Sequence, residues 1–477
     1  MERAVLNRKD NIKPRVKRFL EQTAGGRNPH DTLIFIDHED NVRVMGIGEE
    51  SRYGGAVTPS APAAILSLPN GEKASKVYAT RYNLYILATS GNVYATGNNT
   101  NGNCALAAGE GVVDVIKPTL TAIRNCKSIA IPTAFQYAVS VMFLTNDGRV
   151  FSAGFNQYGQ LGDNTTTQSG NTGPRLTLGP GNTFGNPTAT VVDVIGISGR
   201  DASSGNFAET YCAVLSDGTV WCVGYGGEGQ MGNNTTTAIN SLWRQVRYVT
   251  SDLAIQNVVR VFGNGYQGQG SVYALDSSNN LYAWGYNAQG QLAIGSTANA
   301  SRATLSSINV LDVWCFNGVY GSIIVKRTDG KYYGAGHNLY GQIAVGDTAN
   351  KSSFTEITSL TGKNIEQIYF CGPNAPHVWA KEVGINKIYG AGHNSQGQLG
   401  LYNTASAVTS FTEVPFNVTS PIIDIMPIYT NGIGGYTVIL TADGQTYFTG
   451  QSRYNYAGDP DRNVLSFCQN TWNLVGG

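Results

Sequence analysis

The stretch that decides the fold is LTNDGRVFSAGFNQYGQLGDNTTT, residues 144–167. It contains an apolar strand, a turn at Asp147–Gly148, a second strand with alternating side chains, and a glycine-rich loop. The same pattern returns in LSDGTVWCVGYGGEGQMGNNTTT from Leu215 and in LDSSNNLYAWGYNAQGQLAIG from Leu275. Further copies begin at Asp40, Ser90, Thr328, Ile385 and Ala442. The chain is therefore a repeat protein, and each repeat contains a β-hairpin.

One glycine follows the second strand of every copy and marks the register. These register glycines are Gly46, Gly97, Gly154, Gly224, Gly285, Gly336, Gly392 and Gly450. The 404 residues from the first to the last give an average repeat of about 58 residues, long enough for four short strands. Before several hairpins lies another apolar segment, such as VVDVIGI from Val191 or IIDIM from Ile422, which we expect to form an inner or neighbouring strand.

These features predict an all-β fold, a single closed β-propeller of four-stranded blades. Eight hairpins favour eight blades. In the alternative with seven blades, the N- and C-terminal segments would pair within one blade and close the ring. Closure in either form removes exposed sheet edges.

We divide the chain into a basic N-terminal arm, residues 1–30, and the propeller, residues 31–477. Between Met1 and Arg27 there are eight basic and three acidic residues. Two alternatives stay open for this segment, because Asn11–Gln22 could be helical and Arg15–Gln22 could be the inner strand of the first blade. The candidate anchor residues of the arm are Arg8, Lys9, Lys13, Arg15, Lys17 and Arg18.

The overall composition argues against several partners. Lys plus Arg and Asp plus Glu both total 32, so nothing global attracts nucleic acid or an acidic membrane. No apolar stretch is long enough for a signal-peptide core or a membrane span. We therefore expect a soluble protein made in the cytoplasm.

The cysteines and histidines give no strong indication of a metal site. The seven cysteines are odd in number and lack C-x-x-C spacing. If Asp217–Gly218 is a two-residue turn, Cys212 and Cys222 lie on opposite faces of the hairpin and should not bond. His337 and His393 occupy equivalent repeat positions, where other copies have aromatic residues, so we predict packing or hydrogen bonding for them.

Two further segments could suggest chemistry. The glycines from Gly224 to Gly229 resemble a phosphate loop, but neither G-K-[ST] nor a helix follows. Asp37–Asp40 is predicted as a polar hairpin turn, with cation binding as the alternative. Because no catalytic motif is present, we predict no catalytic, cofactor or metal site and no enzymatic activity.

The loop G-x-N-x-x-G-Q-L-G after D-G-x-V-x-x-x-G is nearly complete at Asp147–Gly162 and is recognisable in eight copies across residues 33–459. This pattern resembles the repeat of the regulator of chromosome condensation family. The resemblance implies a ring, usually seven-bladed, that serves as a docking platform. The best-known member of the family binds chromatin and exchanges nucleotide on a small GTPase. The loops responsible cannot be matched residue by residue here, so that activity is not carried over.

Polar Asn-Thr-Gly loops, few charges and a basic arm are typical of a viral or bacteriophage structural protein. Our leading hypothesis is a non-enzymatic component of the virion, in its tail, neck or capsid, that the arm anchors to other virion proteins. The propeller would then face a host-surface protein or glycan. The alternatives are a cytoplasmic docking protein or guanine-nucleotide exchange factor for a small GTPase, and a glycan-active surface enzyme.

The longest gap between register glycines, from Gly154 to Gly224, contains two long loops, Phe155–Pro174 and Ser198–Glu209. In an up-and-down blade both loops emerge on the same face, and loops on a rigid scaffold often bind partners. Tyr158 and Arg200 are the expected anchors, although the loops could equally be decoration without a partner. The predicted contact residues are Gln157, Tyr158, Asn164, Asn171, Arg175, Arg200 and Asp201. The tracts Asn164–Thr167 and Asn234–Thr237 are predicted as solvated loops.

Overall fold

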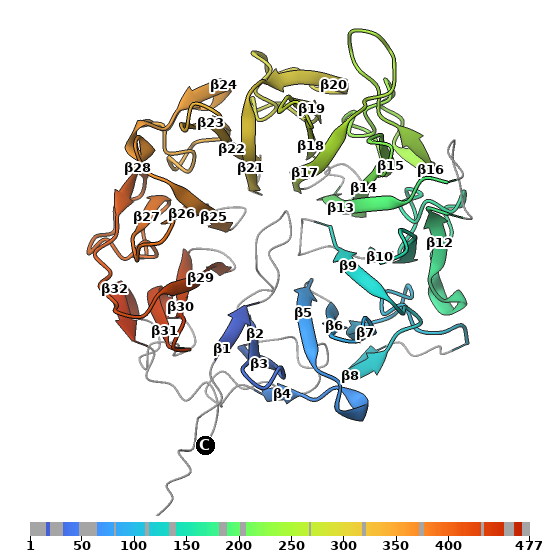
Figure 1. Cartoon of the computed structure of the whole chain (residues 1–477), viewed down its shortest axis with the longest axis horizontal. Helices are drawn as coiled ribbons and strands as arrows, with labels where there is room; N and C mark the ends of the chain where they lie inside the picture. Colours follow the sequence, from blue (N-terminus) through green and yellow to red (C-terminus); the bar gives the residue numbers. More distant parts are fainter. Residues whose placement is uncertain are drawn as a thin grey trace, which may run out of the picture.

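Eight four-stranded antiparallel sheets surround a central axis in the computed structural model of the chain (Figure 1). The prediction of an eight-bladed propeller is therefore confirmed. The structure describes residues 16–19, 32–46, 64–80, 83–109, 114–132, 140–180, 188–200, 207–266, 269–316, 321–371, 376–430, 434–452 and 462–469.

Each blade consists of four consecutive strands. Blades 1 to 4 comprise β1 (Val16–Phe19), β2 (Thr32–Asp37), β3 (Val42–Gly46), β4 (Ala64–Leu66), β5 (Ala74–Ala79), β6 (Asn83–Ala88), β7 (Val93–Asn98), β8 (Asp114–Leu120), β9 (Cys126–Ala130), β10 (Ser140–Thr145), β11 (Val150–Gly154), β12 (Arg175–Leu178), β13 (Val191–Arg200), β14 (Phe207–Leu215), β15 (Val220–Tyr225) and β16 (Ile239–Gln245).

Blades 5 to 8 comprise β17 (Val258–Tyr266), β18 (Gln269–Asp276), β19 (Leu281–Gly285), β20 (Ala300–Ser307), β21 (Val310–Phe316), β22 (Ser322–Arg327), β23 (Tyr332–Gly336), β24 (Lys351–Glu356), β25 (Ile365–Cys371), β26 (His377–Glu382), β27 (Ile388–Gly392), β28 (Val408–Glu413), β29 (Ile422–Thr430), β30 (Gly434–Thr441), β31 (Thr446–Ser452) and β32 (Arg462–Gln469). Three short 3-10 turns complete the described elements: η1 (Pro69–Gly71), η2 (Gly170–Thr172) and η3 (Thr358–Leu360). Within these described ranges there is no helix long and apolar enough to cross a membrane.

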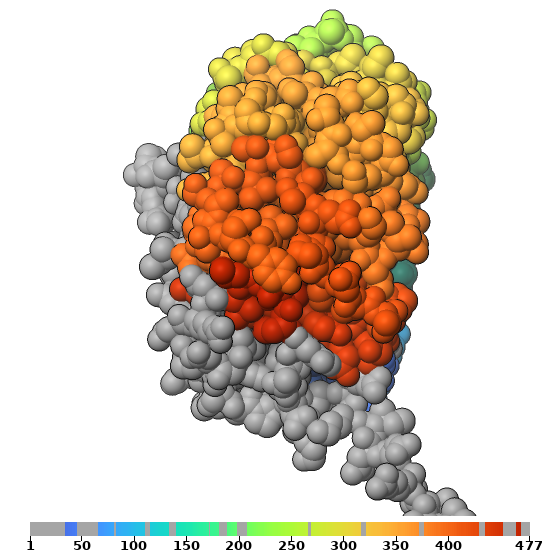
Figure 2. Space-filling view, turned by 90° about the vertical axis from the view of Figure 1, so that its left-hand side faces the viewer, coloured from blue at the N-terminus to red at the C-terminus, as the bar shows by residue number. Residues whose placement is uncertain are grey.

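The first strand of each blade lies nearest the axis, and the fourth lies at the rim (Figure 1). The apolar segments before the hairpins, such as Val191–Arg200, are these innermost strands. No sheet of the described residues combines N- and C-terminal strands, so the seven-bladed alternative is wrong. Instead β1 and β29 meet side by side where the ring closes. Viewed from the side, the C-terminal blades follow one another closely along the rim (Figure 2).

The core lies between neighbouring blades. The second strands β6 (Asn83–Ala88) and β10 (Ser140–Thr145) are buried along their whole length, because both faces of a blade are covered. Between blades 4 and 5, for example, Val214, Met231 and Trp284 belong to one buried cluster. Since each blade buries its apolar faces only against its neighbours, the ring is stabilised as a continuous series of such clusters.

The register glycines have a steric role. Seven of them, from Gly97 to Gly450, have φ between 95° and 118°. A Cβ atom on Gly224 would lie 2.2 Å from the carbonyl oxygen of Glu209 on the neighbouring strand. Glycine is therefore required where the third strand of a blade passes close to the second.

One prediction from the sequence is wrong, because Cys212 and Cys222 form a disulfide with an S–S distance of 2.10 Å. The Leu215 N–H bonds to the Thr219 carbonyl, so the turn has three residues, 216–218, rather than two. This extra residue shifts the pairing by one position and places Cys212 directly opposite Cys222. The disulfide does not include the remaining cysteines, Cys104, Cys126, Cys315, Cys371 and Cys468, which are thiols in the described structure.

The N-terminal segment contributes to the ring. β1, which is Val16–Phe19, pairs with β2 as the innermost strand of blade 1. Four residues of the range 1–30 that we assigned to the arm thus belong to a blade, and the helix considered for Asn11–Gln22 is wrong over these positions. Lys17 and Arg18 lie in β1. The other proposed anchor residues, Arg8, Lys9, Lys13 and Arg15, lie outside the described residues.

Candidate functional site

The loop between the third and fourth strands repeats one hydrogen-bonded frame in several blades. In blade 6 the buried Asn338 side chain accepts from the Ile343 N–H at 3.1 Å and donates to the carbonyls of Asp347 and Ala349 at 2.8 and 3.2 Å. The partners thus lie five, nine and eleven residues after the asparagine. Asn156 in blade 3 and Asn287 in blade 5 bond at the same three spacings. We call this set of bonds the asparagine frame.

Blade 4 builds a related loop from a different residue. Gly226 stands where blades 3, 5 and 6 have the asparagine, and a Cβ there would lie 2.7 Å from the Asn240 Nδ2. Asn240, from the outer strand β16, donates instead to the carbonyls of Gly224 and Thr237 at 3.1 and 2.7 Å. The crowded glycines of this loop therefore have a structural role, as the sequence predicted.

The glutamine of the segment G-Q-L-G, or of its variant G-Q-I-A in blade 6, bonds within the loop. The Gln342 Oε1 accepts from the Tyr340 N–H at 3.0 Å, and its Nε2 lies 2.9 Å from the His337 Nδ1. Gln398 and His393 repeat the contact at 2.7 Å. Both histidines are largely buried, and this desolvation lowers the pKa of each. Hydrogen bonding by these two histidines is thereby confirmed.

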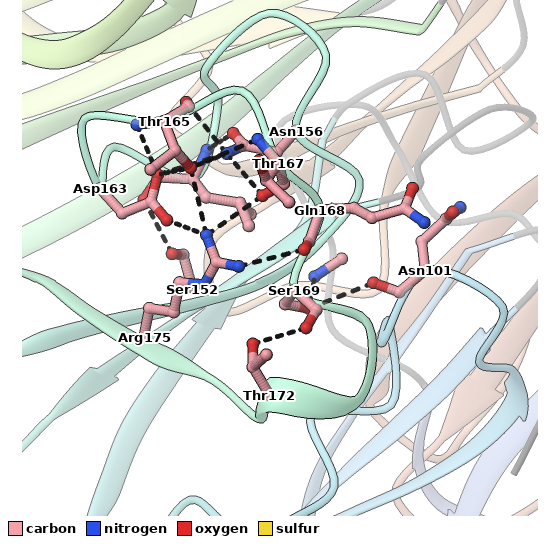
Figure 3. A network of polar contacts seen from close by, with 12 residues as sticks. Asn101, Ser152, Asn156, Asp163, Thr165, Thr167, Gln168, Ser169, Thr172 and Arg175 are labelled. Carbon is pink, nitrogen blue, oxygen red and sulfur yellow. Dashed lines mark hydrogen bonds and ion pairs between the residues drawn. The ribbon is translucent and has the colours of Figure 1, made fainter. Parts of the chain in front are cut away.

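Blade 3 extends the frame into the longest loop of the described chain, Phe155–Pro174, here called the long loop. Arg175, the first residue of β12, closes it from below (Figure 3). Its guanidinium forms an ion pair with Asp163 and donates to the carbonyls of Thr167 and Gln168, both at 3.1 Å. The paired guanidinium and its hydrogen bonds lower the pKa of Asp163 against the effect of burial. Arg175 thus holds the long loop in one conformation.

The long loop also rests on both neighbouring blades. The Gly170 N–H bonds to the Asn101 carbonyl of blade 2 at 2.9 Å (Figure 3 shows Asn101 beside Ser169). On the other side the Asn164 N–H bonds to the Ser241 carbonyl of blade 4, also at 2.9 Å. The loop is therefore fixed to three blades rather than suspended in solvent.

The predicted contact residues differ in their exposure to solvent. Gln157 and Asn164 are exposed, as expected of a contact surface. Tyr158 is only 6% exposed and packs edge-on against Tyr225 with ring centroids 5.2 Å apart, so it does not lie open as the expected anchor. The guanidinium of Arg175 is committed to the loop itself.

The other three residues are described less fully. Asn171 lies in η2 and Arg200 ends β13, but their side chains are outside the described parts of the structure. Asp201 lies outside the described residues altogether. The prediction that Arg200 is an anchor therefore stays a prediction.

The prediction of a long loop at Ser198–Glu209 is wrong, because Ser198–Arg200 pair with Phe207–Glu209 as the ends of β13 and β14. The connections after β11 and after β13 do emerge at the same end of their blades, because neighbouring strands are antiparallel and one connection follows a third strand while the other follows a first strand. We call this end of the ring the loop face. Where the second connection enters β14, the fully buried Glu209 accepts a hydrogen bond from the Ser140 hydroxyl of blade 3. This buried carboxylate ties the two blades together beneath the loops.

The exposed tracts Asn164–Thr167 and Asn234–Thr237 form largely solvated loops, as predicted. Asp37–Asp40 forms the predicted hairpin turn. There the buried Asp37 carboxylate accepts from the Arg43 Nε at 2.6 Å and from the N–H groups of Glu39 and Asn41, which leaves it saturated. Across the described ranges no group of His, Cys, Asp or Glu side chains is arranged to hold a metal ion.

Sequence reasoning missed a groove of about 440 Å3 between blades 2 and 3. The end of the long loop, Thr172–Pro174, forms one wall, and Arg124, Arg149 and Phe151 contribute to the others. These residues come from a loop, an interblade connection and a hairpin. Their distances in the sequence give no indication that they share a surface.

Comparison with known proteins agrees with this architecture. A family model described as the regulator of chromosome condensation (RCC1) repeat matches residues 147–194. The human probable E3 ubiquitin-protein ligase HERC6 is 28% identical over 39% of this chain and 18% of its own length. The dog X-linked retinitis pigmentosa GTPase regulator is 30% identical over 28% of this chain and 13% of its own length. The matched regions thus span less than a fifth of either relative.

Solved structures show the same fold at low sequence identity. Human WBSCR16 superposes with a TM-score of 0.55 and 18% identity, over 83% of this chain and 96% of its own. Yeast RCC1 (Prp20), solved bound to Kap60, gives a TM-score of 0.52 and 16% identity over 80% of this chain and 84% of its own.

Proposed function

Because this chain is a β-propeller built from repeats of the regulator of chromosome condensation family, we propose that it is a non-enzymatic docking protein whose loop face binds a partner protein. One observation carries the proposal. The long loop is held by hydrogen bonds to Arg175 and to both neighbouring blades, while Gln157, Thr166 and Gln168 are left exposed. A preformed polar surface of this kind binds without a large ordering cost.

The relatives favour a cellular docking protein over the virion component that composition first suggested. HERC6 and the GTPase regulator are cellular proteins of human and dog, and yeast Prp20 was solved bound to Kap60. The ligase relatives match this chain only in a minor part of their length, so ligase activity is not part of the proposal. Nucleotide exchange is not part of it either, because no exchange residues can be matched here.

The test introduces negative charges at exposed positions of the long loop and leaves the asparagine frame unchanged. The variant Gln157→Glu/Thr166→Glu/Gln168→Glu changes only exposed side chains. A matched control on the same face is Leu339→Glu/Thr348→Glu/Ala349→Glu in blade 6. Partners of the wild-type chain are identified in its native source by proximity labelling, and their affinities are then measured with purified proteins.

We expect the blade 3 variant to weaken binding of the partner by roughly tenfold or more, because charges placed in a complementary surface are costly. The control and the melting temperature should stay near wild type. Equal affinity of wild type and the blade 3 variant for every identified partner would reject the loop face as the docking site.

A further inference from the structure

The wall of the central channel carries a second, independent feature. All eight innermost strands begin with the same irregularity, a β-bulge two residues after the start of pairing, as at Val191/Asp193 and Val310/Asp312. The residue that follows the bulge therefore occupies an equivalent position in every blade. Around the ring these residues are Arg18, Lys76, Ser128, Asp193, Arg260, Asp312, Gln367 and Asp424.

This ring of bulge positions lies at the end of the channel opposite the loop face, because the bulges pair next to the hairpin turns. Its charges are unevenly distributed. Blades 1 to 3 contribute two basic residues and no acidic one, whereas blades 4 to 8 contribute three aspartates against the single Arg260. The channel end is therefore acidic over blades 4 to 8.

A cavity of about 310 Å3 opens in this acidic sector, between β13, β17, β21 and β25. Asp193, Arg260 and Asp312 contribute its charges, which sum to one negative charge. Further along the channel its wall is aromatic, with Phe262, Trp314 and Phe370. Carboxylates beside aromatic rings form the chemical environment that suits an organic cation.

The cavity already holds one guanidinium in this manner. The Arg260 Nη1 donates to the Asp312 carboxylate at 3.1 Å, and its guanidinium carbon lies 4.7 Å from the centroid of the Phe262 ring. Arg260 is thus neutralised by Asp312 and gives the site no free positive charge for an anion.

Asp193 lacks such a counter-charge. Its Oδ1 accepts from the Val194 N–H at 2.9 Å, and within the described residues it has no ion-pair partner. The nearest cations are Lys127 from β9, whose ammonium donates to the Val192 carbonyl at 3.0 Å, and Arg260 from β17. Burial accordingly raises the pKa of Asp193 although both cations act to lower it. A bound cation would offset the free-energy cost of burying the negative charge of Asp193.

We propose that this cavity of the channel wall binds an organic cation, a guanidinium or ammonium group, with Asp193 as its counter-charge and Trp314 and Phe370 as the adjacent aromatic wall. The cation is a free small molecule or the tip of a basic side chain supplied by another protein. The site lies away from the loop face, so cation binding can be tested independently of the docking function.

The test uses the full-length chain and calorimetric titration with three probes. Agmatine represents a free small cation, and N-acetyl-arginine methylamide represents a side chain. N-acetyl-citrulline methylamide is a neutral control of the same shape. We expect at least one of the two cations to bind and the neutral analogue to bind roughly tenfold or more weakly. Preference for agmatine or for the peptide-like probe identifies the source of the cation. Failure of both cations to bind would overturn the proposal.

Asp193→Asn is the decisive variant. The amide keeps the acceptor for the Val194 N–H and removes the charge, so the ring should remain folded while cation affinity falls by roughly tenfold or more. Asp424→Asn, on the same ring but outside the cavity, should bind like wild type. Wild-type affinity should also decrease as the pH falls through the raised pKa of Asp193, and this dependence should be lost in Asp193→Asn. Equal affinities of wild type and Asp193→Asn would refute the assignment.

Discussion

The loops of blades 3 and 6 share one frame and differ in their length and in how they reach the fourth strand. Both place a fully buried asparagine, Asn156 or Asn338, whose side chain bonds to the main chain five, nine and eleven residues later. Blade 6 then returns to its fourth strand, β24, at Lys351, whereas blade 3 continues to Arg175. Buried side-chain to main-chain bonds therefore define the repeat, and the residues outside them determine what each blade displays.

The largest expected effect breaks what the two loops have in common. Asn156→Ala and Asn338→Ala each remove three hydrogen bonds, one from a buried N–H and two to carbonyls, and in blade 3 the Thr167 carbonyl keeps its bond from Arg175. At about 1 kcal/mol for each lost bond, either variant should lower the free energy of unfolding by roughly 3 kcal/mol. Urea denaturation followed by circular dichroism measures it. A loss below about 1 kcal/mol in both would show that the asparagine frame is not what stabilises these loops.

The second prediction separates the two loops. Both side chains are 22% exposed, but Arg175 bonds to Asp163 and two carbonyls, whereas Lys351 makes one ion pair, with Asp347. Arg175→Ala should cost about 2 kcal/mol and increase amide exchange across residues 163–168. Lys351→Ala should cost less than about 0.5 kcal/mol. Comparable losses in both variants, measured by denaturation and hydrogen exchange, would contradict the assignment of Arg175 as the closure of the long loop.

Most of this architecture was predictable because it is written in repeated local patterns. Positions such as Gly224 and Gly336 recur where only glycine fits, and the strand alternation around them determines the hairpins. The prediction about the two cysteines failed because one additional turn residue changes the pairing register of the hairpin. A third turn residue at Ser216 brought Cys212 opposite Cys222, and hairpin periodicity cannot distinguish two turn residues from three.

The candidate site was predicted less well, for a similar reason. Tyrosine is a residue type that often anchors an interface, but the Tyr158 ring is covered by Tyr225 of the next blade. Arginine is common in contact surfaces, but the guanidinium N–H groups of Arg175 donate to carbonyls of its own loop. The channel cavity escaped notice because Asp193 and Asp312 lie more than a hundred residues apart in the sequence and meet only through the ring. In each of these cases the outcome depends on residues from other parts of the chain, and the repeat pattern does not predict those contacts.

A third prediction uses a flaw in the long loop. The Gln160 Oε1 accepts from the Tyr158 N–H, but its buried Nε2 has no partner among the described residues, whereas the Gln342 Nε2 bonds to His337 in blade 6. Phe155 stands in blade 3 where His337 stands in blade 6. Phe155→His should therefore stabilise the protein by about 1 kcal/mol, and His337→Phe should destabilise it by about 1 kcal/mol. Thermal denaturation of both variants checks the opposite signs, and a shift of the same sign in both would contradict the explanation.

The smallest expected effect is a dependence on pH that belongs to blades 6 and 7 and is absent from blade 3. Because the Gln342 Nε2 can only donate, the His337 Nδ1 must be unprotonated to accept, and the same holds for Gln398 and His393. Burial lowers the pKa of both histidines in the folded protein, so protonation favours the unfolded chain. Their contribution to stability is fully present above the ordinary pKa of 6.5 and is lost as the pH falls below it. The double variant His337→Phe/His393→Phe should therefore be less stable than wild type at pH 8, and the difference should narrow as the pH falls to 5. Melting temperatures measured across this range test the prediction, and a difference that stayed constant with pH would show that neither histidine titrates on unfolding.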